Sequence, residues 1–215
     1  MSTDLQVVYL ARHGETAWSL TGQHAGLTDL PLTETGERVA LRLGERLKGL
    51  NPAKVFSRQL QRAFRTCQLA GFGSVVEVDP DLAKWNFGEY EGRRTADIRL
   101  ERPIGSSFAT AARGVNPRGR YPARADCGVT RVRATAGDVL RFSTGRFVRV
   151  SAARWIGAEP TLHAAAFMLS MASLSALGYE HDLSRPVIRL WDDTKHVRSG
   201  GELKYEGSRA LKALG

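Results

Sequence analysis

The sequence predicts one α/β domain: a three-layer α/β/α sandwich with a mostly parallel central sheet. Short apolar runs, typical of buried parallel strands, alternate with segments whose apolar residues recur every three or four positions. The 215 residues are ample for one such domain and few for two. The composition, 42% apolar and 25% charged, is that of an ordinary globular protein.

The first half of the chain predicts three strands, at residues 7–10, 55–57 and 75–78. Gly14 allows a sharp turn after the first strand, and Thr33 is expected to cap a helix that ends near Gly49. The inward positions of that helix are Ala40, Leu43, Leu47 and Leu50. A second helix begins near Arg62, with an inward stripe of Leu60, Ala63, Cys67 and Ala70.

The second half predicts a strand at residues 138–143 and an amphipathic helix at 147–156. Arg141 lies inside that strand, where a charge needs a partner or an exit to water. Residues 173–179 and 186–191 alternate with period two and predict a closing pair of strands. The domain is expected to span residues 1–197, with a polar, loosely held tail from about Asp193 and over 198–215.

Bulk properties narrow the function classes. No stretch approaches the ~20 apolar residues of a membrane span, and the first residues do not resemble a signal peptide, so a soluble, cytoplasmic protein is expected. Cys67 and Cys127 are expected to be free thiols, because neither lies in a metal-ligand or C-x-x-C spacing.

The net charge of +9 is concentrated in one segment. Fourteen arginines and four acidic residues between Arg93 and Arg154 give +10 there and leave −1 for the rest of the chain. Aromatic residues are not interleaved with these arginines as a base-stacking platform requires. Nucleic-acid binding is therefore a minor alternative, and neither a nucleic-acid partner nor a membrane partner is expected.

The most informative motif is Arg12-His13-Gly14-Glu15-Thr16, which directly follows the first strand. Ligands of open α/β sheets bind at the carboxyl ends of the strands, so His13 is expected at the site. Further motifs follow in order: Trp18-Ser19, Leu32-Thr33-Glu34-Thr35-Gly36, and Ser57 with Leu60-Gln61-Arg62-Ala63 and Thr66. Together they resemble the histidine phosphatase superfamily, which includes phosphoglycerate mutases and small bacterial phosphatases. The Ser57–Thr66 stretch is similar to the family motif S-S-P-L-x-R-A-x-x-T.

The resemblance implies a phosphoglycerate mutase-like fold and phosphoryl transfer to His13 without a metal or organic cofactor. A neutral imidazole is nucleophilic near neutral pH. Arg12 and Arg62 suit the charge on the equatorial oxygens of the transferred group, because guanidinium forks bind such oxygens bidentately. The implied substrate-binding residues are Ser19, His24, Gly26 and Phe147.

Two positions depart from the family pattern. Where relatives carry a second histidine in F-S-S-G-H-F-x-R, this chain has Arg146, which stays protonated and does not reproduce imidazole geometry. The acid of L-x-E-x-x-x-G-x-x-E-G is replaced by Lys84, whose pKa must fall far from about 10.4 to serve near neutrality. Glu89 or Glu91 is an alternative acid.

Residues 103–136 depart from the pattern as a block. Close relatives have about P-D-W-E-L-F-R-D-G-C-P-G-G-E-S-P where this chain runs from Pro103 to Arg118. Removing one base from a suitable coding string for the family segment yields the sixteen residues observed. We hypothesise a single-base slip, restored near residues 123–126, that replaced the acidic lid motif and added arginines.

These observations favour a phosphomonoesterase of small phosphate esters that works through a phosphohistidine, with activity reduced by the changes at positions 84 and 146. The main alternative is a catalytically impaired phosphate-binding relative or the product of a decaying gene. Phosphoglycerate mutase chemistry is a weaker alternative, because a short chain offers little insertion to shield the intermediate from water. The oligomeric state stays open.

Overall fold

A six-stranded mixed sheet forms the centre of the computed structural model, which describes residues 5–79, 82, 86–101 and 120–197. Its order is β3-β2-β4-β1-β5-β6. The strands are β1 (Val8–Arg12), β2 (Lys54–Ser57), β3 (Val76–Val78), β4 (Val139–Ser143), β5 (Leu174–Tyr179) and β6 (Pro186–Asp193). Strands β3, β2, β4 and β1 are parallel, whereas β5 runs antiparallel to β1 and β6. The predicted three-layer fold with a mostly parallel sheet is confirmed.

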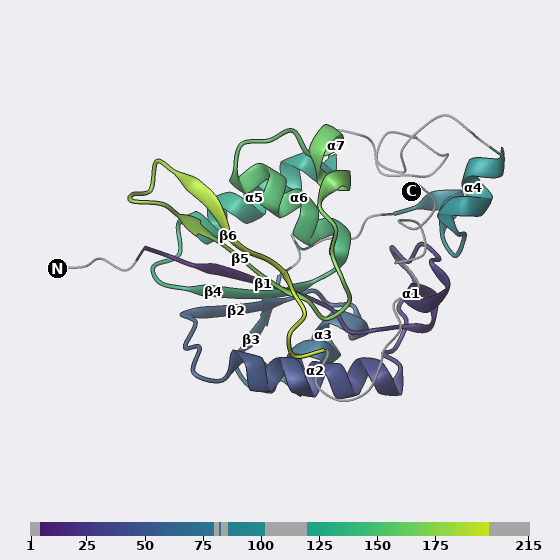
Figure 1. Cartoon of the computed structure of the whole chain (residues 1–215), viewed down its shortest axis with the longest axis horizontal. Helices are drawn as coiled ribbons and strands as arrows, with labels where there is room; N and C mark the ends of the chain where they lie inside the picture. The colour runs from purple at the N-terminus through teal and green to yellow at the C-terminus, as the bar shows by residue number, and fades with distance from the viewer. Residues whose placement is uncertain (1–4, 80–81, 83–85, 102–119, 198–215) are drawn as a thin grey trace, which may run out of the picture.

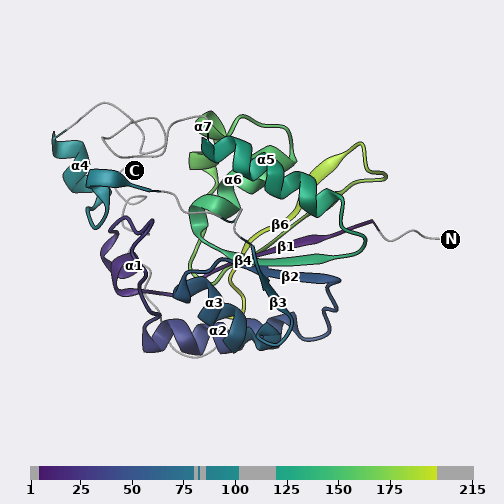
Figure 2. The same cartoon turned by 180° about the vertical axis from the view of Figure 1, so that it is seen from behind.

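Helices cover both faces of the sheet, as Figure 1 and Figure 2 show from opposite sides. Helices α2 and α3 lie on one face, α5, α6 and α7 lie on the other, and α1 and α4 lie beyond the carboxyl ends of the parallel strands. Their bounds are α1 (Ala17–Thr21), α2 (Glu34–Leu47), α3 (Gln61–Cys67), α4 (Thr95–Glu101), α5 (Arg120–Arg133), α6 (Gly145–Trp155) and α7 (Pro160–His163).

The predicted inward stripes form one of the two main cores. Thr33 caps α2 by accepting a hydrogen bond from the Gly36 amide at 3.0 Å, as predicted. Leu50 lies past the end of α2 and is only partly buried. The remaining predicted positions of both helical segments are buried: Ala40, Leu43, Leu47, Leu60, Ala63, Cys67 and Ala70. Both cysteines are free, as expected.

Arg141 has the partner that its place in a covered strand demands. Its guanidinium donates to Asp79 Oδ2 at 2.8 Å, and both side chains are almost fully buried. The rings of Phe56 and Phe147 flank it at 5.7 and 5.4 Å. Asp79 follows β3, two strands away in the sheet, so the ion pair links β4 to β3 across β2.

The arginine-rich segment contains the helix α5. The sequence between residues 103 and 136 offers no clear periodicity, yet α5 forms and buries Val129 and Val132 against α6. Arg133, at its end, donates to the carbonyl of Trp155 and lies over that ring at 4.7 Å. The stretch from Pro103 to Arg118, on which the base-slip hypothesis depends, lies outside the described residues.

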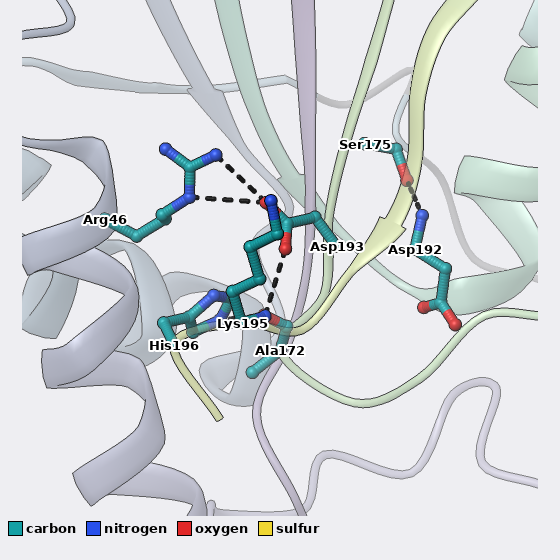
Figure 3. A network of polar contacts seen from close by, with 7 residues as sticks. All are labelled: Arg46, Ala172, Ser175, Asp192, Asp193, Lys195 and His196. Carbon is teal, nitrogen blue, oxygen red and sulfur yellow. Dashed lines mark hydrogen bonds and ion pairs between the residues drawn. The ribbon is translucent and has the colours of Figure 1, made fainter. Parts of the chain in front are cut away.

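The expectation of a loose tail from Asp193 is wrong for residues 193–197. Asp193 and His196 are both 7% exposed. Figure 3 shows Arg46 of α2 contacting Asp193 through two nitrogens, at 3.0 and 3.3 Å. His196 Nε2 lies 2.8 Å from the carbonyl oxygen of Ala172, so it donates there. An ion pair and a buried hydrogen bond therefore fix this segment to the domain.

None of the helices within the described ranges is both long and apolar enough to cross a membrane. In the same ranges, no three His, Cys, Asp or Glu side chains come together in a way that could hold a metal ion.

Candidate functional site

His13 lies one residue beyond the carboxyl end of β1, where the sequence predicts it. Its amide donates to the carbonyl of Ser143 on β4 at 3.0 Å. Its own carbonyl accepts from the amide of Ala172, just before β5, also at 3.0 Å. Backbone bonds to both neighbouring strand ends therefore hold the residue at the centre of this edge.

The tautomer of His13 follows from one hydrogen bond. Nδ1 lies 2.7 Å from the carbonyl oxygen of Gly14, which can only accept, so Nδ1 carries the proton. The ring is only 6% exposed. Burial, followed by the nearby positive charges of Arg62, Arg12 and Arg58, lowers the pKa of His13 well below 6.5. The neutral ring therefore keeps a lone pair on Nε2, as a nucleophile requires.

The charges of Arg12 and Arg62 both lower the pKa of His13, so the two guanidiniums lie near its ring. Arg12 donates to the carbonyl of Leu169 and passes over Gly145, where a Cβ atom would lie 2.9 Å from its Nε. Arg62 is 1% exposed, and its Nε has no hydrogen-bond partner within the described ranges. The predicted grouping of two guanidiniums around one imidazole is thus present.

The loop at residues 25–28 forms a wall of the site. Arg62 donates to the carbonyls of Thr28, Ala25 and Gly26 at 2.7, 3.1 and 3.3 Å. Glu91 Oε1 accepts from the amides of Gly26 and Thr28 at 2.7 and 2.9 Å. Gly26, a predicted substrate-binding residue, therefore lies beside Arg62. Glu91 anchors the loop through acceptor contacts, which do not support the alternative that it acts as the acid.

Arg146 and His24 meet at Phe87. The Arg146 guanidinium carbon lies 4.8 Å from the centre of the Phe87 ring, and the His24 ring stacks on Phe87 at 4.6 Å. Burial and the charge of Arg146 lower the pKa of His24. Both side chains thus lie at the Phe87 ring, and the roles predicted for them stay predictions.

Three further residues were predicted for the site: Ser19, Phe147 and Lys84. Ser19 forms a capping box with Thr16 at the start of α1. Phe147 is 1% exposed in the core beside Arg141. Lys84 lies outside the described residues. The roles assigned to these three residues stay predictions.

The sequence interpretation missed Arg58 and Thr144. Arg58 is 3% exposed and donates to the Thr144 hydroxyl at 3.4 Å and to the Gly26 carbonyl at 3.2 Å. Each residue directly follows a parallel strand, β2 and β4 respectively. A charged residue immediately after an apolar strand was the signal available in the sequence.

Gly14 serves close packing rather than a turn. A Cβ atom at Gly14 would lie 2.7 Å from the Gly36 carbonyl oxygen, and one at Gly36 would lie 2.4 Å from that of Glu15. The Thr33 hydroxyl also donates to Glu15 Oε1 at 2.7 Å. The first turn of α2 is thus packed against the loop that carries His13.

Two surface hollows lie away from these residues, between α2 and α3 and between α2 and the π-helical turn Gln68–Phe72. Neither is lined by His13 or by the arginines around it. The candidate site is therefore defined by the chemistry at the strand ends.

Comparisons with known proteins agree with this geometry. A family model of the histidine phosphatase superfamily (branch 1) matches residues 8–194. An acid phosphatase of Mycobacterium tuberculosis is 35% identical over 177 residues, which cover 80% of this chain and 86% of that protein. A sedoheptulose 1,7-bisphosphatase of Saccharomyces cerevisiae is 31% identical over 181 residues, covering 69% of this chain and 66% of that protein.

A solved structure of a Mycobacterium tuberculosis open reading frame superposes with a TM-score of 0.81 at 31% identity, covering 87% of this chain and 97% of that chain. The sequence match extends from β1 to the end of β6 and so includes every strand of the sheet. With His13 held beside Arg12 and Arg62 at the strand ends, the chain belongs to the histidine phosphatase superfamily.

Proposed function

We propose that the protein is a phosphomonoesterase that hydrolyses small phosphate esters through a phosphohistidine on His13. The observation that carries the proposal is the neutral His13 ring, with Nδ1 bound to the Gly14 carbonyl and guanidinium groups close by. Phosphatases among the similar proteins support hydrolysis over other uses of the same site.

In the first step, His13 Nε2 forms a bond to phosphorus while the bond from phosphorus to the ester oxygen breaks. The ester oxygen leaves with a proton supplied by a general acid, a position that Lys84 occupies in the family pattern. In the second step, the deprotonated acid takes a proton from water as the water oxygen attacks phosphorus, the bond to nitrogen breaks, and inorganic phosphate leaves, which restores the acid and the neutral His13. Arg12 and Arg62 balance the negative charge on the phosphoryl oxygens in both steps.

Activity below that of a typical family member is part of the proposal. Lysine is a poor proton donor unless its pKa falls strongly, and Arg146 lies against Phe87. The second candidate, a phosphate-binding relative that does not turn over, rests on the same two residues.

Hydrolysis of p-nitrophenyl phosphate by three proteins tests the proposal. The unchanged chain should be slow, and Lys84→Glu combined with Arg146→His should be faster by roughly a hundredfold, the typical contribution of a positioned acid. His13→Ala should lose the activity of both. Equal rates for the unchanged chain and His13→Ala would refute the nucleophile assignment. If the double variant is no faster than the unchanged chain, the claim that Lys84 and Arg146 reduce the activity is refuted.

A further inference from the structure

Arg58 lies at the same sheet edge as the nucleophile. Its amide donates to the Phe142 carbonyl of β4 at 3.2 Å, just as the His13 amide donates to the next carbonyl of that strand, Ser143. Arg58, Thr144 and His13 are therefore the residues directly beyond three adjacent parallel strands, β2, β4 and β1. This register places Arg58 beside Thr144 and two strand positions from His13, at the same edge of the sheet.

The Arg58 guanidinium lies between Thr144 and the loop at residues 25–28. One of its terminal nitrogens donates to Thr144, and the other donates to the Gly26 carbonyl at 3.2 Å. Arg62 donates to the same carbonyl at 3.3 Å, so the two guanidiniums meet at one oxygen atom. The charge of Arg58 also acts on the His13 ring, in the same direction as those of Arg12 and Arg62.

An arginine at position 58 departs from the family motif. The family motif S-S-P-L-x-R-A has serine at the position of Arg58. A buried guanidinium keeps its charge at any physiological pH, and its planar fork of N–H donors matches the geometry of an oxyanion. A transferred phosphoryl group offers three equatorial oxygens, and guanidinium donors suit each of them.

We propose that Arg58 is a third phosphoryl-binding guanidinium of this site, acting beside Arg12 and Arg62 on the group that His13 attacks. This inference rests on the proposed function. Arg58 then does from the end of β2 part of what the sequence pattern assigned to Arg146, which lies at Phe87. The site holds its oxyanion with three arginines drawn from β1, from the loop after β2 and from α3.

Arg58→Gln tests the inference, with Arg65→Gln as the matched control. Arg65 lies on the exposed side of α3, where it pairs with Glu37, and its substitution changes the net charge equally. Inhibition of p-nitrophenyl phosphate hydrolysis by orthovanadate, and the KM for the ester, are measured on both variants and on the unchanged chain. Arg58→Gln should weaken vanadate binding by roughly tenfold to a hundredfold, and Arg65→Gln by less than twofold.

Two further readouts separate the possible results. Arg58→Lys keeps the positive charge but lacks the two-pronged guanidinium, so its vanadate affinity should lie between those of Arg58→Gln and the unchanged chain. If Arg58→Gln does not fold, Arg58→Lys alone tests whether Arg58 binds the phosphoryl group. Arg58→Gln should also move the acidic limb of kcat/KM to higher pH, because the charge of Arg58 lowers the pKa of His13. Unchanged vanadate affinity in Arg58→Gln or Arg58→Lys overturns the inference while leaving the function intact if His13→Ala is inactive. An active His13→Ala overturns the function itself.

Discussion

At the scale of single residues, the protonation of His13 is the decisive feature. Burial and arginine charges both favour the neutral ring, and the Gly14 carbonyl selects the tautomer with an open Nε2. A histidine at an ordinary pKa of about 6.5 would lose its nucleophilic form progressively in mild acid. This one is built to stay deprotonated there.

The acidic limb of kcat/KM that reports His13 is therefore expected below pH 6.5. Since the pKa in the folded protein is lowered, the neutral form persists as the pH falls past the value at which an exposed histidine takes up a proton. A pH–rate profile with an aryl phosphate checks this. A limb at pH 7 or above that belongs to His13 would contradict the environment described.

At the scale of elements, the buried ion pair between Asp79 and Arg141 connects β3 to β4 across β2. Arg131 of α5 adds a second contact to the same carboxylate, at 2.9 Å. One aspartate thus joins the edge of the sheet, a central strand and the helix that covers them. Such pairs are costly to break from one side, because the remaining charge stays buried.

Asp79→Ala is expected to destabilise the fold by about 3–5 kcal/mol, since it leaves Arg141 buried without this carboxylate. Adding Arg141→Met should recover much of the loss, because the uncompensated charge goes with it. Urea unfolding of the two variants and the parent measures both values. A double variant less stable than Asp79→Ala alone would show that the pair is not the source of the cost.

Local patterns explain why several elements could be predicted. The cap at Thr33, the apolar runs and the inward stripes each depend on neighbours within a few residues. They were confirmed except for Leu50, which lies past the end of α2 and is only partly buried. The sequence indicated that Arg141 needs a partner, but it did not identify Asp79, which is 62 residues away. Arg58 was missed for the same reason, since its contact with Thr144 joins residues 86 positions apart. The polar segment from Asp193 looked loose because the ion pair of Asp193 with Arg46 joins residues 147 positions apart.

At the scale of the whole molecule, the end of the described chain returns to the body of the domain. Arg46 holds Asp193 from α2, and His196 donates to Ala172, whose amide in turn donates to His13. Residues 193–196, drawn with Ala172 in Figure 3, are therefore linked through Ala172 to the backbone of His13. Their loss is expected to affect the site as well as stability.

Asp193→Asn should lower the free energy of unfolding by about 1 kcal/mol at neutral pH, because a charge-assisted bond is lost. Burial alone would raise the pKa of Asp193, but the Lys195 amide and Arg46 outweigh it and lower that pKa below 3.8. The stabilisation is present above pH 4 and is lost as the pH falls through the lowered value. Thermal unfolding at pH 7 and pH 2.5 should show a smaller difference between variant and parent at the lower pH.

The contact between Gly14 and Gly36 restricts how this enzyme can move. Since backbone meets backbone there, a displacement of the start of α2 would carry the His13 loop with it. The loop at residues 25–28 is held as well, by Arg62 through its carbonyls and by Glu91 through its amides. An incoming ester would therefore meet a cradle whose shape exists before it arrives.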